Sequence, residues 1–269
     1  MLKSGYWQDL TTDQLQDVDP EKTIAMLPVS AVEQHGPHLP LSTDAVISQG
    51  IVDGLLRKVP RDLTLLVLPA LSIGHSLEHT AYPGTLSSSA EILLALWVDV
   101  CRCAVRSGIR KLIFLNSHGG QAQLVDIAAL RLRADLGLLT VRADYFRLGS
   151  PDELFDTEEL ALGIHGGEVE TSLMLHLRPD LVRLEALKDF IGLPVQMARE
   201  NAILGVEEPV GIGWMSQDLN RSGVVGNAAG ADAERGSRLL SYLADRLAIL
   251  LRETAGTPLS VIRKGPQQC

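Results

Sequence analysis

Potential metal ligands are concentrated between positions 33 and 44 of this chain. The stretch reads Glu-Gln-His-Gly-Pro-His-Leu-Pro-Leu-Ser-Thr-Asp and follows the apolar run 24–29. Residues two apart project to the same side of an extended strand, so Glu33 and His35 can face one point. Asp44 can return to that point from the start of the next helix. Two carboxylates and an imidazole that converge at the end of a strand predict a metal site.

Three further segments that contain histidine add candidate ligands. The loop 74–79 and the motif Asn-Ser-His-Gly-Gly around His118 each follow a candidate strand, as the first segment does. The fourth segment, His-Gly-Gly-Glu-Val-Glu-Thr-Ser from His165, opens a helix on which Glu168 and Glu170 cannot face the same way. Because ligands bind outside the carboxyl ends of strands in open parallel sheets, we expect these loops to share one rim.

Each of these residues also has an interpretation without chemistry. Asp44 can be a helix N-cap, and His118 can be a loop histidine beside a Gly-Gly turn. Glu168 can favour a helix N-terminus through the macrodipole alone. His38, which follows a proline, and His176, on an apolar helical face, are better explained as structural or surface residues. Four segments that each pair histidine with Glu, Asp, Ser or Asn favour one shared metal-dependent active site.

The candidate ligands outnumber what one catalytic metal needs. They are Glu33, His35, Asp44, His118 and Glu168. Imidazole and carboxylate ligands without thiolate suit Zn²⁺, Mn²⁺ or Fe²⁺ and do not discriminate among them. A single catalytic metal must keep an open position, whereas two metals that share a bridging carboxylate accommodate all of these ligands. Asp44 arrives from a separate element and is the natural bridge.

Short apolar runs alternate with longer helical patterns along the chain. The runs are rich in Val, Leu and Ile without strict alternation, as in strands buried on both faces. Predicted strands cover 23–29, 63–68, 111–115 and 138–143, and the main predicted helices cover 43–56, 88–108, 121–136 and 231–253, the second of these opened by a Ser88-x-x-Glu91 capping box. This order predicts an α/β fold, with a mostly parallel sheet between helices, in one domain over 1–269. The less regular stretch 180–227 predicts loops and an extra hairpin.

Composition limits the class of protein and partner. The 269 residues are 46% hydrophobic and carry a formal net charge of -9 without a Lys/Arg stripe, which argues against a nucleic-acid partner. No apolar run matches a signal core or a membrane span. The three cysteines form no Cys-x-x-Cys pair, which is consistent with a reducing compartment. We therefore expect a cytoplasmic protein that acts on a small molecule and has no membrane partner.

Four segments of the chain resemble the creatininase (creatinine amidohydrolase) family, in matching order over about residues 20–240. They are the Glu-Gln-His-Gly-Pro-His-Leu-Pro stretch with Thr43 and Asp44, His-Ser-Leu-Glu-His at 75–79 with Tyr-Pro-Gly-Thr-Leu at 82–86, Asn-Ser-His-Gly-Gly at 116–120, and the segment 165–172. The resemblance implies a three-layer αβα sandwich and a centre of two divalent metals. It also implies hydrolysis of a C–N bond in a small, often cyclic, amide or formamide, and a homo-oligomer, commonly a hexamer.

The resemblance further implies which residues hold each metal. Glu33, Asp44 and His118 would hold one metal. His35, Asp44 and an additional carboxylate would hold the other. His165 matches a histidine that shuttles protons at the substrate.

One position departs from the pattern of creatininase proper. That enzyme has a ligating glutamate two residues after the equivalent of His118, where this chain has Gly120. Glu168 is our candidate replacement, as in the branch of the family with the His-x-Gly-Glu-x-Glu-Thr-Ser pattern. That branch includes formamide deformylases, a peptidase of mycofactocin maturation and a hydrolase of keto-inositols, so creatinine is not the expected substrate.

The expected reaction begins with a bridging water whose pKa the two metals lower, so that a hydroxide attacks the substrate carbonyl. His165 then delivers a proton to the leaving nitrogen, a role suited to a group that titrates near pH 7. We expect Ser76, Glu78 and His79 to line the pocket and contact the substrate.

Two alternative functions stay open. One is cleavage of a C–C bond in a cyclic ketone such as a keto-inositol, and the other is a non-catalytic metal-binding protein of the same fold. A phosphoesterase is less favoured because no Arg or Lys flanks the motifs closely.

Overall fold

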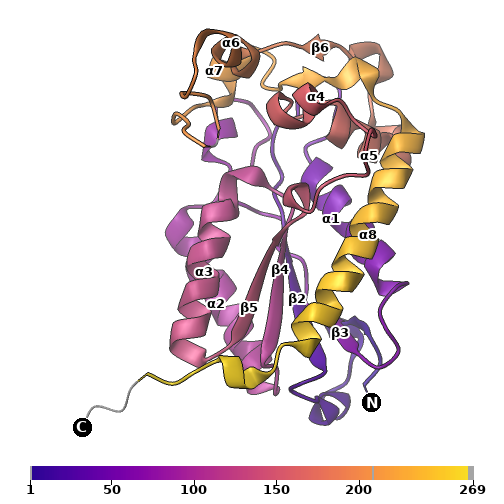
Figure 1. Ribbon diagram of the computed structural model, residues 1–269, viewed down its shortest axis with the longest axis vertical. Helices are drawn as coiled ribbons and strands as arrows, with labels where there is room; N and C mark the ends of the chain where they lie inside the picture. Colours follow the sequence, from indigo (N-terminus) through magenta and orange to yellow (C-terminus); the bar gives the residue numbers. More distant parts are fainter. Residues whose placement is uncertain (1, 208, 266–269) are drawn as a thin grey trace.

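A parallel five-stranded sheet forms the centre of the fold (Figure 1). The computed structural model describes residues 2–207 and 209–265. The strands run in the order β1-β3-β2-β4-β5, and each neighbouring pair is parallel. They are β1 (Gly5–Tyr6), β2 (Thr23–Val29), β3 (Thr64–Val67), β4 (Lys111–Asn116) and β5 (Leu139–Asp144). The last four confirm the predicted strands to within one residue at each end, whereas β1 is too short to leave a pattern in the sequence.

Helices cover both faces of the sheet, which confirms the predicted αβα sandwich (Figure 1). On one face, α1 (Thr43–Leu56), α5 (Glu168–Leu177) and α8 (Ala233–Gly256) share an apolar core with the strands. On the other face, α2 (Ala90–Arg106) and α3 (Ala122–Leu136) do the same. The strands β2, β3 and β4 are buried on both sides, which explains their continuous apolar sequences. Within the described residues, none of the helices combines the length and apolarity needed to cross a membrane.

Two helix starts differ from what the sequence suggested. The N-cap of α2 is Ser89, one residue later than the predicted capping box, and its side chain accepts a hydrogen bond from the N–H of Ile92. The N-cap position of α1 is Ser42, so Asp44 lies inside the first turn of that helix. The carboxylate of Asp44 is therefore not occupied as a cap and is available to the loops nearby.

Short elements cover the carboxyl end of the sheet (Figure 1). These are α4 (Thr157–Leu162), α6 (Leu193–Glu200), α7 (Ser216–Leu219) and an antiparallel pair, β6 (Asp189–Phe190) with β7 (Gly226–Asn227). The predicted extra hairpin corresponds to this pair, although α6 and α7 lie between its two strands. An antiparallel bridge between His165 and Val225 joins this cover to the fourth histidine segment.

The order of the strands brings three of the histidine segments to one rim. β2 lies between β3 and β4, and all three run in the same direction. The loops that follow them therefore emerge side by side at the carboxyl end of the sheet. This arrangement confirms the expectation that these three segments share a rim. The short elements that cover the rim hold the fourth segment, through the bridge between His165 and Val225.

Candidate metal centre

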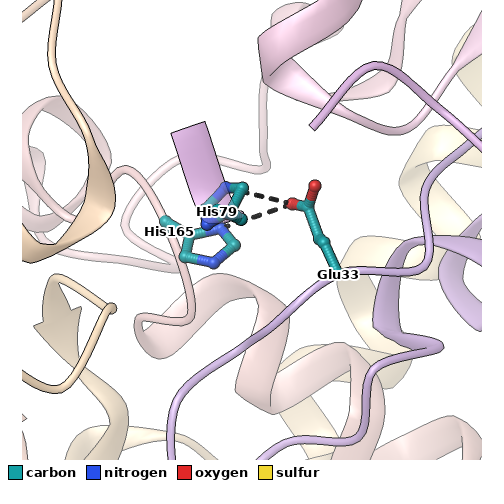
Figure 2. Close-up of side chains that lie close together, drawn as sticks. All are labelled: Glu33, His79 and His165. Carbon is teal, nitrogen blue, oxygen red and sulfur yellow. Dashed lines mark ion pairs between the residues drawn. The ribbon is translucent and has the colours of Figure 1, made fainter. Parts of the chain in front are cut away.

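Glu33 lies at the centre of a buried cluster on this rim. Its Oε1 atom lies 3.2 Å from Nδ1 of His118, 3.3 Å from Nε2 of His79 and 4.0 Å from Nδ1 of His165. Figure 2 shows the last two rings side by side, both directed at the carboxylate. The side chain of Glu33 is 1% exposed. One carboxylate thus gathers imidazoles from three separate loops.

Asp44 faces two histidines with its two oxygens. Oδ1 lies 3.2 Å from Nε2 of His35, and Oδ2 lies 3.5 Å from Nδ1 of His118. Thr43 and Asp44 are both fully buried at the start of α1. A carboxylate that presents one oxygen to each of two ligand groups has the geometry of a bridge between two cations.

A tight turn brings His35 to this position. Gly36 has φ +70, a left-handed conformation that favours glycine, and a Cβ there would lie 2.7 Å from the side chain of Val224. The Gly-Pro sequence after His35 therefore lets the loop turn back beneath the cover. His38 follows this turn, stacks on Phe190 and bonds through Nε2 to Gly166, so its interpretation as a structural residue fits its surroundings.

Three imidazoles of the cluster are held by backbone carbonyl groups. Nδ1 of His35 donates to the carbonyl of Glu33 at 3.1 Å, and Nε2 of His118 donates to the carbonyl of His75 at 2.9 Å. Nε2 of His165 donates to the carbonyl of Gln34 at 2.9 Å. In each ring the nitrogen that faces the carbonyl keeps a proton, so the other nitrogen, which faces the carboxylates, is the one that can bind a metal in place of a proton. Metal-binding histidines are held in this way.

His79 has the opposite arrangement. The amide of Gln34 has a fixed orientation because its Oε1 accepts from the N–H of Gly36 and its Nε2 donates to the carbonyl of Gly223 at 2.6 Å. The second N–H of this amide lies 2.7 Å from Nδ1 of His79, which therefore accepts. The proton of His79 is then on Nε2, where it donates toward Glu33. His79 is set up as a hydrogen-bond donor rather than as a ligand.

The two glutamates of the fourth segment, Glu168 and Glu170, have different partners in the structure. Glu168 does not reach the cluster, because its Oε1 lies 2.6 Å from the guanidinium of Arg235 on α8. Oε2 of Glu170 lies 3.7 Å from Nε2 of His35 and accepts from the N–H of Gly166 at 2.7 Å. The two residues lie in the first turn of α5 and face different ways, as expected, but Glu170 is the one that faces the centre.

The remaining predicted residues lie around this cluster. Ser76 is fully buried behind His118, with Oγ 3.4 Å from Nε2 of that ring. Glu78 lies 3.6 Å from the same nitrogen and 3.8 Å from Nε2 of His79. His176 is exposed on α5, as its interpretation as a surface residue requires.

The charges of the cluster create a site for cations. Burial lowers the pKa of an imidazole, yet Asp44 beside His35 and Glu33 beside His118 raise the pKa of both rings to about 10. Burial raises the pKa of a carboxyl group, yet His118, together with His79 and His165, holds the pKa of Glu33 below its usual range. Burial and the charge of Glu33 raise the pKa of Asp44 to about 7. The carboxylates thus attract positive charge strongly, whether protons or metal ions.

Unpaired atoms give a direct test of whether a divalent metal fits. Among the described residues of the cluster, Oε2 of Glu33, Nε2 of His35 and Oδ2 of Asp44 are buried without a hydrogen-bond partner. Buried polar atoms are normally satisfied, so three such atoms in one cluster require an explanation. One ligand atom from each of these three residues lies within 4.8 Å of the others, as do those of His35, His165 and Glu170. Nitrogen and carboxylate oxygen at this spacing fit a divalent transition metal.

Comparison with known proteins identifies the family of this chain. The sequence profile of the family described as creatininase, creatinine amidohydrolase, matches residues 8–251. The chain belongs to the creatininase family. The resemblance found in its four segments is therefore confirmed over most of its length.

Several members of the creatininase family are similar to this chain. A mycofactocin precursor peptide peptidase of Mycobacterium tuberculosis (strain ATCC 25618 / H37Rv) is 30% identical over 244 residues, which cover 87% of this chain and 86% of the relative. The creatinine amidohydrolase of Pseudomonas putida is 30% identical over 206 residues, which cover 70% and 78%. A solved creatininase variant of Zn-Zn type shares the fold, with a TM-score of 0.75 at 24% identity over 95% of this chain and 100% of that chain. The two curated relatives are named as hydrolases, one of a peptide and one of creatinine.

Proposed function

We propose that this chain hydrolyses the C–N bond of an amide with the help of two divalent cations. Amide hydrolysis is what a peptidase and a creatinine amidohydrolase have in common, so it is the reaction that membership of the family favours. The observation that carries the proposal is the position of Asp44, with one oxygen on His35 and the other on His118. A single cation would contact only one of the two oxygens of Asp44 and would leave the other oxygen without a cation.

The proposed ligands divide into two sets that share Asp44. Glu33, Asp44 and His118 would hold one cation, with Nδ1 of His118 as the nitrogen ligand. His35, Asp44 and Glu170 would hold the other, with Nε2 of His35 as the nitrogen ligand. Glu170 replaces Glu168 in this proposal because only Glu170 faces His35. Two divalent cations there would make water acidic enough to act as a nucleophile near neutral pH and would polarise a carbonyl oxygen.

Beside these cations, His165 would transfer a proton and His79 would donate a hydrogen bond. His165 is bonded through Nε2 to the carbonyl of Gln34, so Nδ1 is the atom that exchanges a proton with the substrate. Burial and the nearby charge of His35 lower the pKa of His165 to about 4, below the value near 7 expected from the sequence. The ring is therefore neutral at pH 7, where it can accept a proton but is a weaker base than a free imidazole. It would pass that proton to the leaving nitrogen. His79 keeps its proton on Nε2 and would hold the carboxylate of Glu33 in place.

The proposed reaction is tested with a panel of amides. Protein loaded with Zn²⁺ or Mn²⁺ is incubated with N-formyl compounds, cyclic amides, short peptides and, for the alternative reaction, a cyclic ketone such as a keto-inositol. Products are identified by mass and by the release of an amine or a new carboxylate. We expect one class to gain one water and to open or split at C–N. Loss of a C–C bond from a cyclic ketone would support the alternative reaction. Two bound metals with no turnover of any of these compounds would support a non-catalytic protein.

Replacing His165 by Asn separates proton transfer from metal binding. We expect kcat to fall by about 10²–10⁴-fold, the usual contribution of a positioned acid or base, while metal content and KM change little. Metal content is measured by plasma mass spectrometry on the same preparation that is assayed. His165 also lies within ligand distance of His35 and Glu170, so loss of metal in step with activity would make it a ligand.

A further inference from the structure

Gly120 leaves a space that a different residue fills. It lies in the single 3₁₀ turn η4 (Gly119–Gln121) directly after His118. A Cβ on Gly120 would lie 1.7 Å from Oε1 of Glu78 and 2.7 Å from its Cδ. Gly120 has no left-handed backbone, so its φ does not call for glycine, and a side chain here would have to displace the end of the Glu78 side chain. The neighbouring Gly119 has nothing within 4 Å of its Cβ position.

The carboxylate in this space belongs to another loop. Glu78 lies in the turn η3 (Leu77–His79), in the loop that follows β3, and its backbone carbonyl accepts from Oγ of Ser216 on α7 at 2.8 Å. The loop is thereby anchored with the side chain directed at the cluster. The side chain of Glu78 is 13% exposed, so its carboxylate is largely withdrawn from water.

The neighbours of Glu78 indicate what this carboxylate serves. Its Oε1 lies 3.6 Å from Nε2 of His118, the nitrogen that donates to the carbonyl of His75, and 3.8 Å from Nε2 of His79. With Glu33 and His118 it forms a group whose ligand atoms all lie within 4.8 Å of one another. His79 is held neutral by the amide of Gln34, so it offers Glu78 a hydrogen but no positive charge. A charge withdrawn from water needs a partner of opposite sign. In the metal-free protein this partner is His118, and once Nδ1 of His118 binds a metal, the metal would take over that part.

We propose that Glu78 is a third carboxylate on the His118 side of the metal centre, in the space that Gly120 leaves open. The inference rests on the proposed function, because it needs cations at Glu33 and His118. With Glu33, Asp44 and Glu170, it brings four negative charges to the centre, which balance two divalent cations.

The test removes or displaces this carboxylate by substitutions at two positions, 78 and 120. Glu78→Ala deletes it, Glu78→Gln removes only its charge, and Gly120→Ala displaces it without altering it. Gly119→Ala is the matched control in the same turn. Affinity for Zn²⁺ and Mn²⁺ is measured by competition with a chelator, stoichiometry by plasma mass spectrometry, and folding of each metal-free variant by circular dichroism and thermal unfolding.

We expect the three variants at positions 78 and 120 to bind metal about 10–100-fold more weakly, the range for groups that support metal ligands. Gly119→Ala should match the wild type. In the double variant Glu78→Ala/Gly120→Ala, the second change should add little, because no carboxylate remains to be displaced.

Three outcomes would overturn the inference. The first is wild-type affinity in Glu78→Ala and Glu78→Gln. The second is a full additional loss in the double variant, since a Cβ on Gly120 would also lie 2.9 Å from Nε2 of His118 and could act through that ring. The third is a wild-type chain that binds no metal, which would overturn the proposed function as well. Two metals in the wild type with the first outcome would overturn the role of Glu78 alone.

Discussion

Asp44→Asn is expected to abolish binding of both cations and to lower kcat/KM by roughly a thousandfold or more, about 4 kcal/mol of transition-state stabilisation. The amide keeps the shape of the side chain but loses the charge that faces His35 and His118. Because both proposed cation sites share this residue, neither keeps its full set of ligands. No other single substitution in the cluster is expected to remove two ions at once.

The fold should survive this change. Burial and the charge of Glu33 raise the pKa of Asp44 to about 7 in the folded, metal-free protein. A carboxyl group whose folded pKa is raised loses stability as the pH rises from its unfolded value near 4 through its folded value. Asn carries no such charge, so metal-free Asp44→Asn should unfold at a temperature no lower than metal-free wild type at pH 8.

Metal content, activity and thermal unfolding of Asp44→Asn are compared with those of Asp53→Asn. Asp53 lies on the same helix, α1, where it bonds Tyr6 away from the cluster. This control should retain both metals and full activity. Two tightly bound metals in Asp44→Asn would show that Asp44 is not the bridge.

The second large effect concerns the two glutamates of α5. Glu170→Gln is expected to lose one of two cations, the one near His35, and with it most activity. Glu168→Gln should keep both cations and normal turnover, because Glu168 faces Arg235. It should instead lower the free energy of unfolding by about 2 kcal/mol, since a buried charged hydrogen bond between α5 and α8 is lost.

Each variant is the control for the other. Both replace a glutamate by its amide in the same turn, so a general disturbance of the start of α5 would affect them equally. Metal stoichiometry and chemical denaturation are measured for both metal-free and metal-loaded protein. One metal in Glu168→Gln with two in Glu170→Gln would restore the assignment first made from the sequence.

The sequence predicted the scaffold well because local patterns determine it. The strands β2, β3, β4 and β5 follow from runs of buried apolar residues, and a parallel sheet then requires that their carboxyl ends share a rim. The convergence of Glu33, His35, Asp44 and His118 was predictable from the same reasoning.

The choice between Glu168 and Glu170 was not predictable in this way. Their spacing shows only that they face different ways, and the partner that fixes Glu168 is Arg235, which is far away in sequence. The fixed amide of Gln34 and the proposed role of Glu78 at the metal centre were not predictable for a similar reason, although the sequence did place Glu78 in the pocket wall. Gln34 looks like a spacer between two ligands until Gly223 fixes its amide, and Glu78 gains its place only because Gly120 lies opposite it. Gly120, at a position where the resemblance implies a ligand, was the one signal in the sequence of the space that Glu78 occupies.

The central claim is a centre of two cations bridged by Asp44. Crystals of the protein loaded with Mn²⁺ and measured at the manganese absorption edge test it most directly, because anomalous scattering locates each ion independently of the protein atoms. We predict two anomalous peaks per chain about 3.5–4 Å apart, one on each side of the Asp44 carboxylate. A single peak, or two peaks of which only one contacts Asp44, would contradict this account.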